Sequence, residues 1–159
     1  GGFFFTSDQH EQLFYRPKSI SDDSVPSGLV YATDTLLYMG FISGNHKYIE
    51  AAHGALDFIY KSIDDNLTST VSAINLLRED NLEKEIIIVR TNEKAWEKIT
   101  DSEEYYAKCI IFIENELQNL PDYIAIKESK GEFTSYHCKG MTCQAPKLSF
   151  EDFIDTLKT

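Results

Sequence analysis

Six charged side chains with the potential for chemistry lie close together near the start of the chain. They are Asp8, Glu11, Arg16, Lys18, Asp22 and Asp23. Paired carboxylates serve in general acid–base catalysis, and a nearby cation holds a carboxylate ionised or binds an anion. Asp8 and Asp23 are the strongest catalytic candidates, because each lies beside a turn. The alternative interpretation is that these groups form surface ion pairs and turn caps.

Aromatic side chains accompany these charges. Phe3, Phe4 and Phe5 follow two glycines, and strand alternation would send Phe4 to the opposite face from the other two. They would form either a stacking wall for a ligand or part of the core, and core packing is the commoner use of such residues. Arg16 follows a tyrosine and precedes a proline, where its guanidinium would be partly buried and paired.

The three cysteines offer a second kind of chemistry. Cys138 and Cys143 have C-x4-C spacing rather than the C-x-x-C of thioredoxin-like sites, and a disulfide between them is sterically allowed. Two free thiols are the favoured interpretation, and a redox pair is the alternative. Cys109 is flanked by isoleucine and is expected to be an inert core residue. His137 adds a third potential metal ligand to the two cysteines, but no fourth ligand is evident. The sequence therefore predicts no metal site and no cofactor.

The composition limits the partners of the chain. Its 159 residues carry a net charge of −11, which disfavours nucleic acid and anionic membranes, since both attract clustered Lys and Arg. No stretch approaches the ~20 apolar residues that span a bilayer. Low cysteine use favours a reducing compartment, so the sequence predicts a cytoplasmic protein. Because the chain does not begin with Met, we expect it to be the carboxy-terminal piece of a longer protein.

Helical periodicity follows the opening stretch. Apolar residues recur at spacings of three and four over 29–43 and 48–63, and a third helix is predicted from about Leu67 to Glu79. Gly44 and Asn45 separate the first two helices. So short a link predicts an antiparallel helical hairpin.

The periodicity then changes to runs of β-branched residues. Glu85–Val89 and Cys109–Ile113 are typical of buried strands, and a short helix over 93–100 between them predicts a parallel βαβ pair. Glu132–Cys138 is predicted to be another strand. A last amphipathic helix, with Ser149 as its cap, is predicted to end at Leu157. Glycine-rich phosphate loops are absent from the sequence, which argues against a Rossmann or P-loop nucleotide site.

Two segments of the chain resemble one protein family. They are the opening GGFFFTSDQHEQLFYRPKSISDDSVPSG and the ending SYHCKGMTCQAP with the helix after it. Both are similar to the carboxy-terminal part of the thioredoxin-domain proteins related to spermatogenesis-associated protein 20, whereas residues 82–130 match only in pattern. The family usually follows PSG with Asn-Ser. Leu29 and Val30 stand there in this chain, which removes a polar contact at the ring centre if that Asn makes one.

The resemblance implies a fold that is mainly α with a small α/β insert. It is a partial (α/α)6 toroid, made of helical hairpins plus a short mixed or parallel sheet, and similar to N-acylglucosamine 2-epimerases and six-hairpin glycosidases. Residues 1–81 and 148–159 would be the terminal hairpins of the toroid, and 82–147 would be the insert. The full-length proteins carry a thioredoxin-like domain before the toroid.

The resemblance also implies carbohydrate chemistry of an epimerase or glycosidase kind. Such chemistry uses pairs of carboxylates, here the catalytic candidates Asp8 and Asp23. The substrate-binding candidates are Phe4, Arg16, Lys18 and Ser27. The possible partner of this site is a sugar.

Two other hypotheses compete with carbohydrate chemistry. The chain would be a non-catalytic scaffold or interaction module, or a thiol-redox-linked protein that uses Cys138 and Cys143. A toroid fragment would also expose the apolar faces of the helices over 29–43 and 48–63. We therefore expect the fragment to bind the missing amino-terminal part of the same protein or to form a homodimer.

Overall fold

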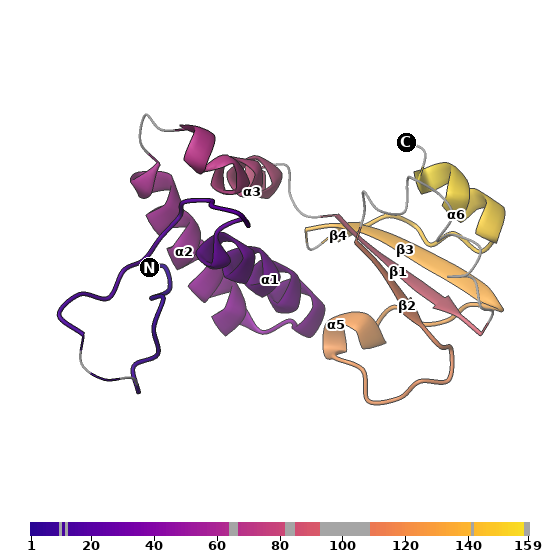
Figure 1. The fold of residues 1–159 in the computed structure, drawn as a ribbon. Helices are drawn as coiled ribbons and strands as arrows, with labels where there is room; N and C mark the ends of the chain where they lie inside the picture. The colour runs from indigo at the N-terminus through magenta and orange to yellow at the C-terminus, as the bar shows by residue number, and fades with distance from the viewer. Residues whose placement is uncertain are drawn as a thin grey trace. The chain divides into compact units, whose positions relative to one another are not determined.

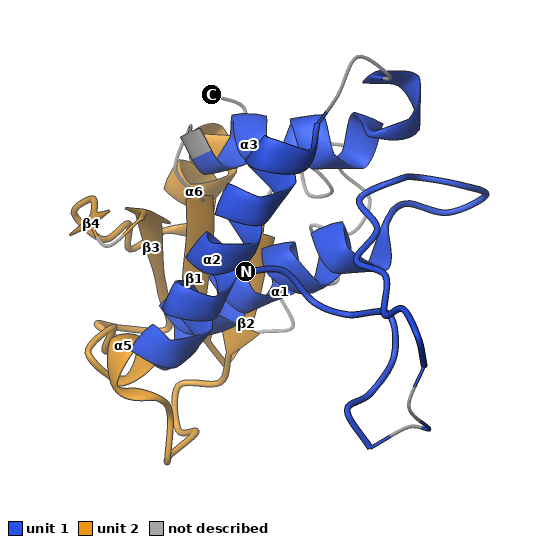
Figure 2. Ribbon diagram, turned by 90° about the vertical axis from the view of Figure 1, so that its left-hand side faces the viewer, with its two compact units in different colours: residues 1–82 blue, residues 83–159 orange. Residues whose placement is uncertain are grey.

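The computed structural model describes residues 1–9, 11, 13–63, 67–81, 85–92, 109–140 and 142–157. The chain forms two compact units, Gly1–Leu82 and Glu83–Thr159, which Figure 2 distinguishes by colour. The described part of the first unit is helical, and that of the second combines a sheet with helices (Figure 1).

Helices α1 (Gly28–Ser43), α2 (His46–Ser62) and α3 (Val71–Asn81), with the 3-10 turn η1 (Leu67–Ser69), build the first unit. Their bounds confirm the three helices that the periodicity predicts. Gly44 ends α1 with a φ of 67°, a left-handed conformation that glycine adopts without strain. The side chain of Asn45 then caps α2 by accepting a hydrogen bond from Lys47 N at 3.1 Å.

One hydrophobic core joins the three helices to the opening stretch. Its buried side chains are Ile20, Leu29, Val30, Leu37, Ala52, Leu56, Ile59, Ala73 and Leu76. Helices α1 and α2 approach closely at Gly40, where an added Cβ would lie only 2.5 Å from Ile49 Cγ1. Burial of this apolar surface stabilises the predicted hairpin.

Some apolar side chains of the same helices remain exposed. They include Tyr31 and Met39 on α1 and Tyr60 on α2. Single exposed apolar residues are common on protein surfaces. The expected homodimer of the fragment therefore stays a prediction.

Asp22 joins the opening stretch to α3. Its carboxylate accepts hydrogen bonds from Ser72 N at 2.8 Å, from Ser72 Oγ, and from Ser27 N at 2.9 Å. Burial raises the pKa of Asp22, but the hydrogen bonds from Ser72, Ser27 and Val71 outweigh burial and lower the pKa below its ordinary value. One carboxylate thus satisfies backbone donors at the starts of both α1 and α3.

The second unit is built on a mixed four-stranded sheet in the order β2-β1-β3-β4. Its strands are β1 (Glu85–Thr91), β2 (Cys109–Ile113), β3 (Phe133–Lys139) and β4 (Thr142–Cys143). Strand β1 runs parallel to β2 and antiparallel to β3, which confirms the predicted parallel pair. The helix predicted over 93–100 lies outside the described residues.

The two parallel strands differ in burial. In β1 every residue after Glu85 is buried, whereas in β2 only Ile113 is buried and the others are half-buried. The difference follows from position, because β1 is paired on both sides and β2 is at the edge of the described sheet. Cys109, which we expected in the core, is accordingly half-buried.

Two helices accompany the described sheet. The short helix α5 (Asp122–Ala125) follows β2, and α6 (Phe150–Leu157) covers one face of the sheet. The buried side chains that meet between α6 and the strands are Ile87, Val89, Phe133, Phe153 and Leu157. Ser149 Oγ accepts a hydrogen bond from Asp152 N at 3.1 Å, which confirms the predicted cap.

The predicted (α/α)6 toroid is wrong, and the chain has an α+β fold. In a toroid the last helix would pack on other helices, but the apolar face of α6 packs on strands. Residues 148–159, which we expected with the hairpins, accordingly belong to the Glu83–Thr159 unit. An amphipathic pattern predicts that a helix is buried on one side, but it does not say what buries it.

Replacing Asp22 with Asn should lower the free energy of unfolding of the first unit by about 1–2 kcal/mol, the usual cost of losing a helix cap. The folded-state pKa is lowered from 3.8, so the stabilisation is present above that pH and is lost as the pH falls through the folded-state pKa. Urea unfolding of wild type and Asp22→Asn, measured from neutral pH downward, would show the two stabilities converging. The matched control is Asp23→Asn, an exposed neighbour. An equal loss in that control would contradict the assignment.

Candidate functional site

Arg16 holds two parts of the opening stretch together. Phe5 N donates a hydrogen bond to Pro17 O at 2.9 Å, so the two segments lie side by side. Arg16 Nη2 donates to Thr6 O at 2.6 Å, and Arg16 Nε donates to Thr6 Oγ1 at 3.3 Å. Its guanidinium carbon also lies 4.3 Å from the centroid of the Phe4 ring, in a cation–π contact.

Lys18 ties the same segments to the helices. Its Nζ donates to Gly1 O at 2.6 Å and lies 4.4 Å from the Phe4 ring centroid. The Phe58 ring of α2 is 5.3 Å from the same nitrogen. The structure thus brings together three of the predicted substrate-binding residues, and the contacts of both cations are structural.

The other candidates of the opening stretch do not join this cluster. Asp8 is exposed and accepts from Ser7 Oγ at 3.3 Å. Asp23 is exposed, and Ser27 is buried with its Oγ donating to Ser19 O at 2.8 Å. No hydrogen bond or ion pair among the described residues links any of the three to Arg16. The charge pattern therefore does not produce a convergent acid–base site in this part of the structure.

A disulfide joins Cys138 of β3 to Cys143 of β4. The sequence analysis favours two free thiols, but the structure contains the disulfide. Gly140, with a φ of 55°, helps to turn the chain so that the two cysteines become direct cross-strand partners. Gln144 N donates to His137 O at 2.9 Å, which leaves the cysteines in the adjacent non-hydrogen-bonded pair. Side chains are closest at such pairs. We call β3, β4 and this bond the disulfide hairpin.

The two sulfurs differ in their surroundings. Cys138 is only 1% exposed, whereas Cys143 is half-buried and is the more accessible of the two. Tyr123 Oη of α5 lies 3.9 Å from Cys143 Sγ. Burial raises the pKa of Tyr123, so its hydroxyl keeps its proton at neutral pH and can donate toward the sulfur.

A carboxylate–imidazole pair lies next to the disulfide hairpin. His137 Nε2 is 3.4 Å from Glu85 Oε2, and His137 Nδ1 is buried with no hydrogen-bond partner among the described residues. The pair lines a groove of about 440 Å³, whose other walls come from Gln144, Lys147, Asp152, Asp155 and Thr156. The groove is thus lined by an imidazole beside a carboxylate.

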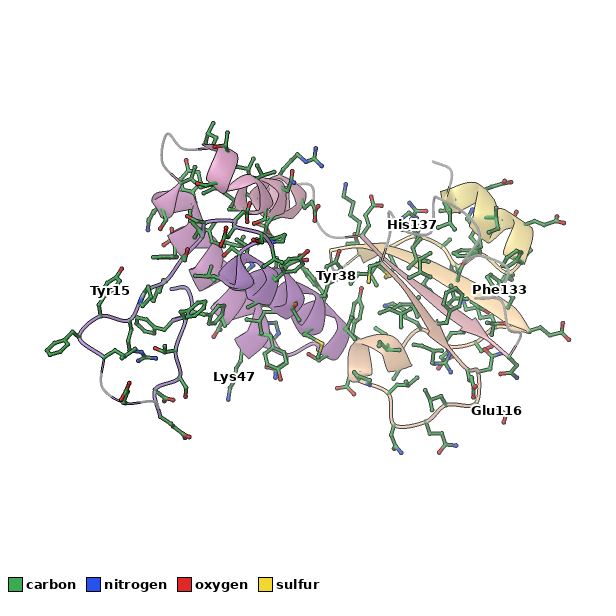
Figure 3. All side chains as sticks on the ribbon, in the orientation of Figure 1. Tyr15, Tyr38, Lys47, Glu116, Phe133 and His137 are labelled. Carbon is green, nitrogen blue, oxygen red and sulfur yellow. A yellow bond between two sulfur atoms is a disulfide. The ribbon has the colours of Figure 1, made fainter. Side chains whose placement is uncertain are left out.

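The sequence analysis missed this pair because its members are far apart in the chain. The only signal was that Glu85 begins one predicted strand and His137 lies near the end of another. Which residues meet depends on register, and β3 pairs with β1 so that His137 is opposite Ile87, two positions from Glu85. In Figure 3, His137 and Phe133 lie toward opposite ends of β3.

No group of three His, Cys, Asp or Glu side chains in the described ranges is arranged to hold a metal ion. No described helix has both the length and the apolar character that crossing a bilayer requires. Comparisons of this chain with protein-family models, curated proteins and solved structures gave no match. The family resemblance therefore rests on the two sequence segments described above.

Replacing Arg16 with Met should loosen the opening stretch while the helices stay folded. The change removes two hydrogen bonds and a cation–π contact at a half-buried site, so we expect the free energy of unfolding to fall by less than about 1 kcal/mol. The Phe5 amide, which is bonded to Pro17 O, should exchange its hydrogen faster. Amide hydrogen exchange by NMR would measure this, with Lys47→Met at an exposed position of α2 as the control. Unchanged exchange at Phe5 would show that Arg16 does not hold the segments together.

Proposed function

We propose that this chain is a thiol-redox-linked protein whose disulfide hairpin exchanges with an external dithiol. The observation that carries the proposal is the pairing of Cys138 with Cys143 across two adjacent strands. Strand β4 has two residues and is at the edge of the described sheet. Opening it would disturb few backbone hydrogen bonds, which suits a bond that is made and broken repeatedly.

The predicted location supports the same function. Stable disulfides are rare in the cytoplasm, where those that do form are usually transient and serve in catalysis or redox sensing. A cytoplasmic chain that places two of its three cysteines as cross-strand partners therefore favours a reversible bond over a structural one. The family that the chain resembles carries a thioredoxin-like domain, and such a domain supplies a dithiol of the required class.

Reduction would proceed in two steps. A thiolate of the dithiol attacks Cys143 Sγ, the more accessible sulfur, forming a mixed disulfide and releasing Cys138 as a thiolate that takes up a proton. The second thiol of the dithiol then attacks the first sulfur of the same dithiol, which is bonded to Cys143 in the mixed disulfide. This step releases Cys143. The protein gains two electrons and two protons, and the dithiol becomes a disulfide.

One side chain favours exchange at Cys143. The neutral Tyr123 hydroxyl, 3.9 Å from Cys143 Sγ, would stabilise the thiolate that leaves in the second step. The Glu85–His137 pair lines a second, smaller pocket of about 230 Å³ that Cys143 also lines. The carbohydrate and scaffold hypotheses stay predictions, because no geometry among the described residues of the opening stretch favours either.

Reducing the disulfide should lower the free energy of unfolding by about 2 kcal/mol, the loop-entropy value for so short a loop. Denaturant unfolding with and without reductant would measure the difference. Cys109→Ser is the control, since it removes the remaining thiol and should leave the effect of reductant intact. A reductant effect that persists in Cys138→Ser would contradict the assignment.

Exchange itself can be tested by thiol counting. Alkylation after denaturation without reductant should label Cys109 alone, and incubation of the native protein with a thioredoxin-type dithiol should add Cys138 and Cys143. Tyr123→Phe should slow the exchange, because it removes the donor beside Cys143. If all three cysteines are labelled before reduction, or if the dithiol leaves the bond intact, the proposed function is wrong.

A further inference from the structure

Arg90 is a buried cation that the disulfide chemistry does not use. It lies on β1 and is only 5% exposed. Its Nη2 donates to Asn115 O at 2.8 Å, while its Nε is buried and has no hydrogen-bond partner in the described part of the chain. No carboxylate among the described residues forms an ion pair with it. A buried guanidinium without a counter-ion is unfavourable, so the site is complete only when an anion is bound.

Arg90 lines a pocket of about 420 Å³ at the carboxyl end of the parallel strands β1 and β2. The rest of the wall comes from Asn115, from residues 117–120, from Ala125, and from Glu128 and Ser129. Figure 1 shows this loop leaving the end of β2, and Figure 3 labels Glu116 within it. The carboxyl ends of parallel strands are where open α/β sheets usually bind ligands. We call this cavity the Arg90 pocket.

Asn115 gives the Arg90 pocket an acceptor to match its donor. Its Nδ2 lies 3.2 Å from Gly131 O and 3.4 Å from Glu132 O, and its N donates to Asn92 Oδ1 at 3.0 Å. These contacts fix the amide, and they leave its Oδ1 buried without a hydrogen-bond partner. A ligand that completes the pocket therefore presents an anionic acceptor to Arg90 and a donor to Asn115.

The charges of the wall limit the ligand further. Among the described residues that line the pocket, Arg90 is the single cation and Glu128 is the single anion. Glu128 would repel a ligand with several negative charges more strongly than a monoanion, and a zwitterion carries no net charge for it to repel. A guanidinium binds a carboxylate through two parallel hydrogen bonds, a match of shape as well as charge.

We propose that the Arg90 pocket binds a small monocarboxylate that carries a hydroxyl or ammonium group next to its carboxylate. The carboxylate accepts from the Arg90 guanidinium, and the neighbouring group donates to Asn115 Oδ1. Both protein atoms are shielded from solvent in the free protein, so the loop over residues 115–120 shifts when the ligand enters. The inference stands on the sheet geometry alone and does not depend on the redox function.

The test is an NMR titration of the full chain with glycolate, glycine, acetate and inorganic phosphate, at constant ionic strength. Glycolate or glycine should shift the amide signals of residues 115–120 and bind more tightly than acetate, which has no donor, and than phosphate, which carries more charge. Comparing glycolate with glycine identifies which donor the pocket prefers. Equal shifts from sodium chloride, or acetate binding as tightly as the other two carboxylates, would overturn the proposal.

Two variants of pocket residues and one control variant test whether the ligand binds in the Arg90 pocket. Arg90→Lys keeps the charge but loses the planar fork, and it should weaken binding by at least about tenfold, as expected for the loss of a charge-assisted hydrogen bond. The control Arg78→Lys, at an exposed position of α3, should bind like wild type. Asn115→Asp places a carboxylate beside Arg90 and should abolish binding even if Arg90→Lys fails to fold. Undiminished binding in either pocket variant would show that the ligand sits elsewhere.

Discussion

The second unit depends on strand β1, which is paired on both sides and buried on both faces. Ile86, Ile87, Ile88 and Val89 are each at most 2% exposed, a degree of burial that leaves little room for a polar group or a shift of register. A shift of one residue would turn every inward side chain of β3 to the opposite face. Glu85 and Arg90 lie on β1, His137 and Cys138 lie on its partner β3, and Asn115 follows its partner β2, so the positions of these groups follow from this register.

The same strand separates the two candidate chemistries. Glu85 begins β1, beside His137 and the disulfide hairpin, and Arg90 lies near the other end of β1, where the parallel pair finishes. Strand alternation also sends His137 and Cys138 to opposite faces of β3. His137 and Cys138 are thus neighbours in sequence whose side chains lie on opposite faces of β3, although His137 and Cys143 line the same pocket at the strand end. Redox exchange and carboxylate binding can therefore be tested independently by variants at the two ends of one strand.

Local pattern predicted the elements well and their partners poorly. Spacings of three and four residues gave α1, α2 and α3, and the runs EIIIV and CIIFI gave a parallel pair, since each pattern reports on its own segment. The prediction of a toroid was wrong because α6 packs on strands rather than on helices. What a helix packs on depends on residues far away in sequence. Strand β4 went unpredicted because two residues carry no periodicity. The preference for free thiols over the disulfide came from the predicted cytoplasmic location, not from any feature of the segment itself.

The opening stretch shows why charge pattern alone did not identify a site. Arg16, Lys18 and Asp22 have the residue types of a catalytic cluster, yet each makes hydrogen bonds to neighbouring protein groups that hold the stretch in place. Arg90 Nε, Asn115 Oδ1 and His137 Nδ1 are buried, and nothing in the described structure partners them. Buried polar atoms without partners raise the free energy of the folded state, so they are retained only where something offsets that cost. Ligand binding is such a compensation, and for this reason the chemistry of the chain is to be sought on the sheet rather than in its more highly charged opening stretch.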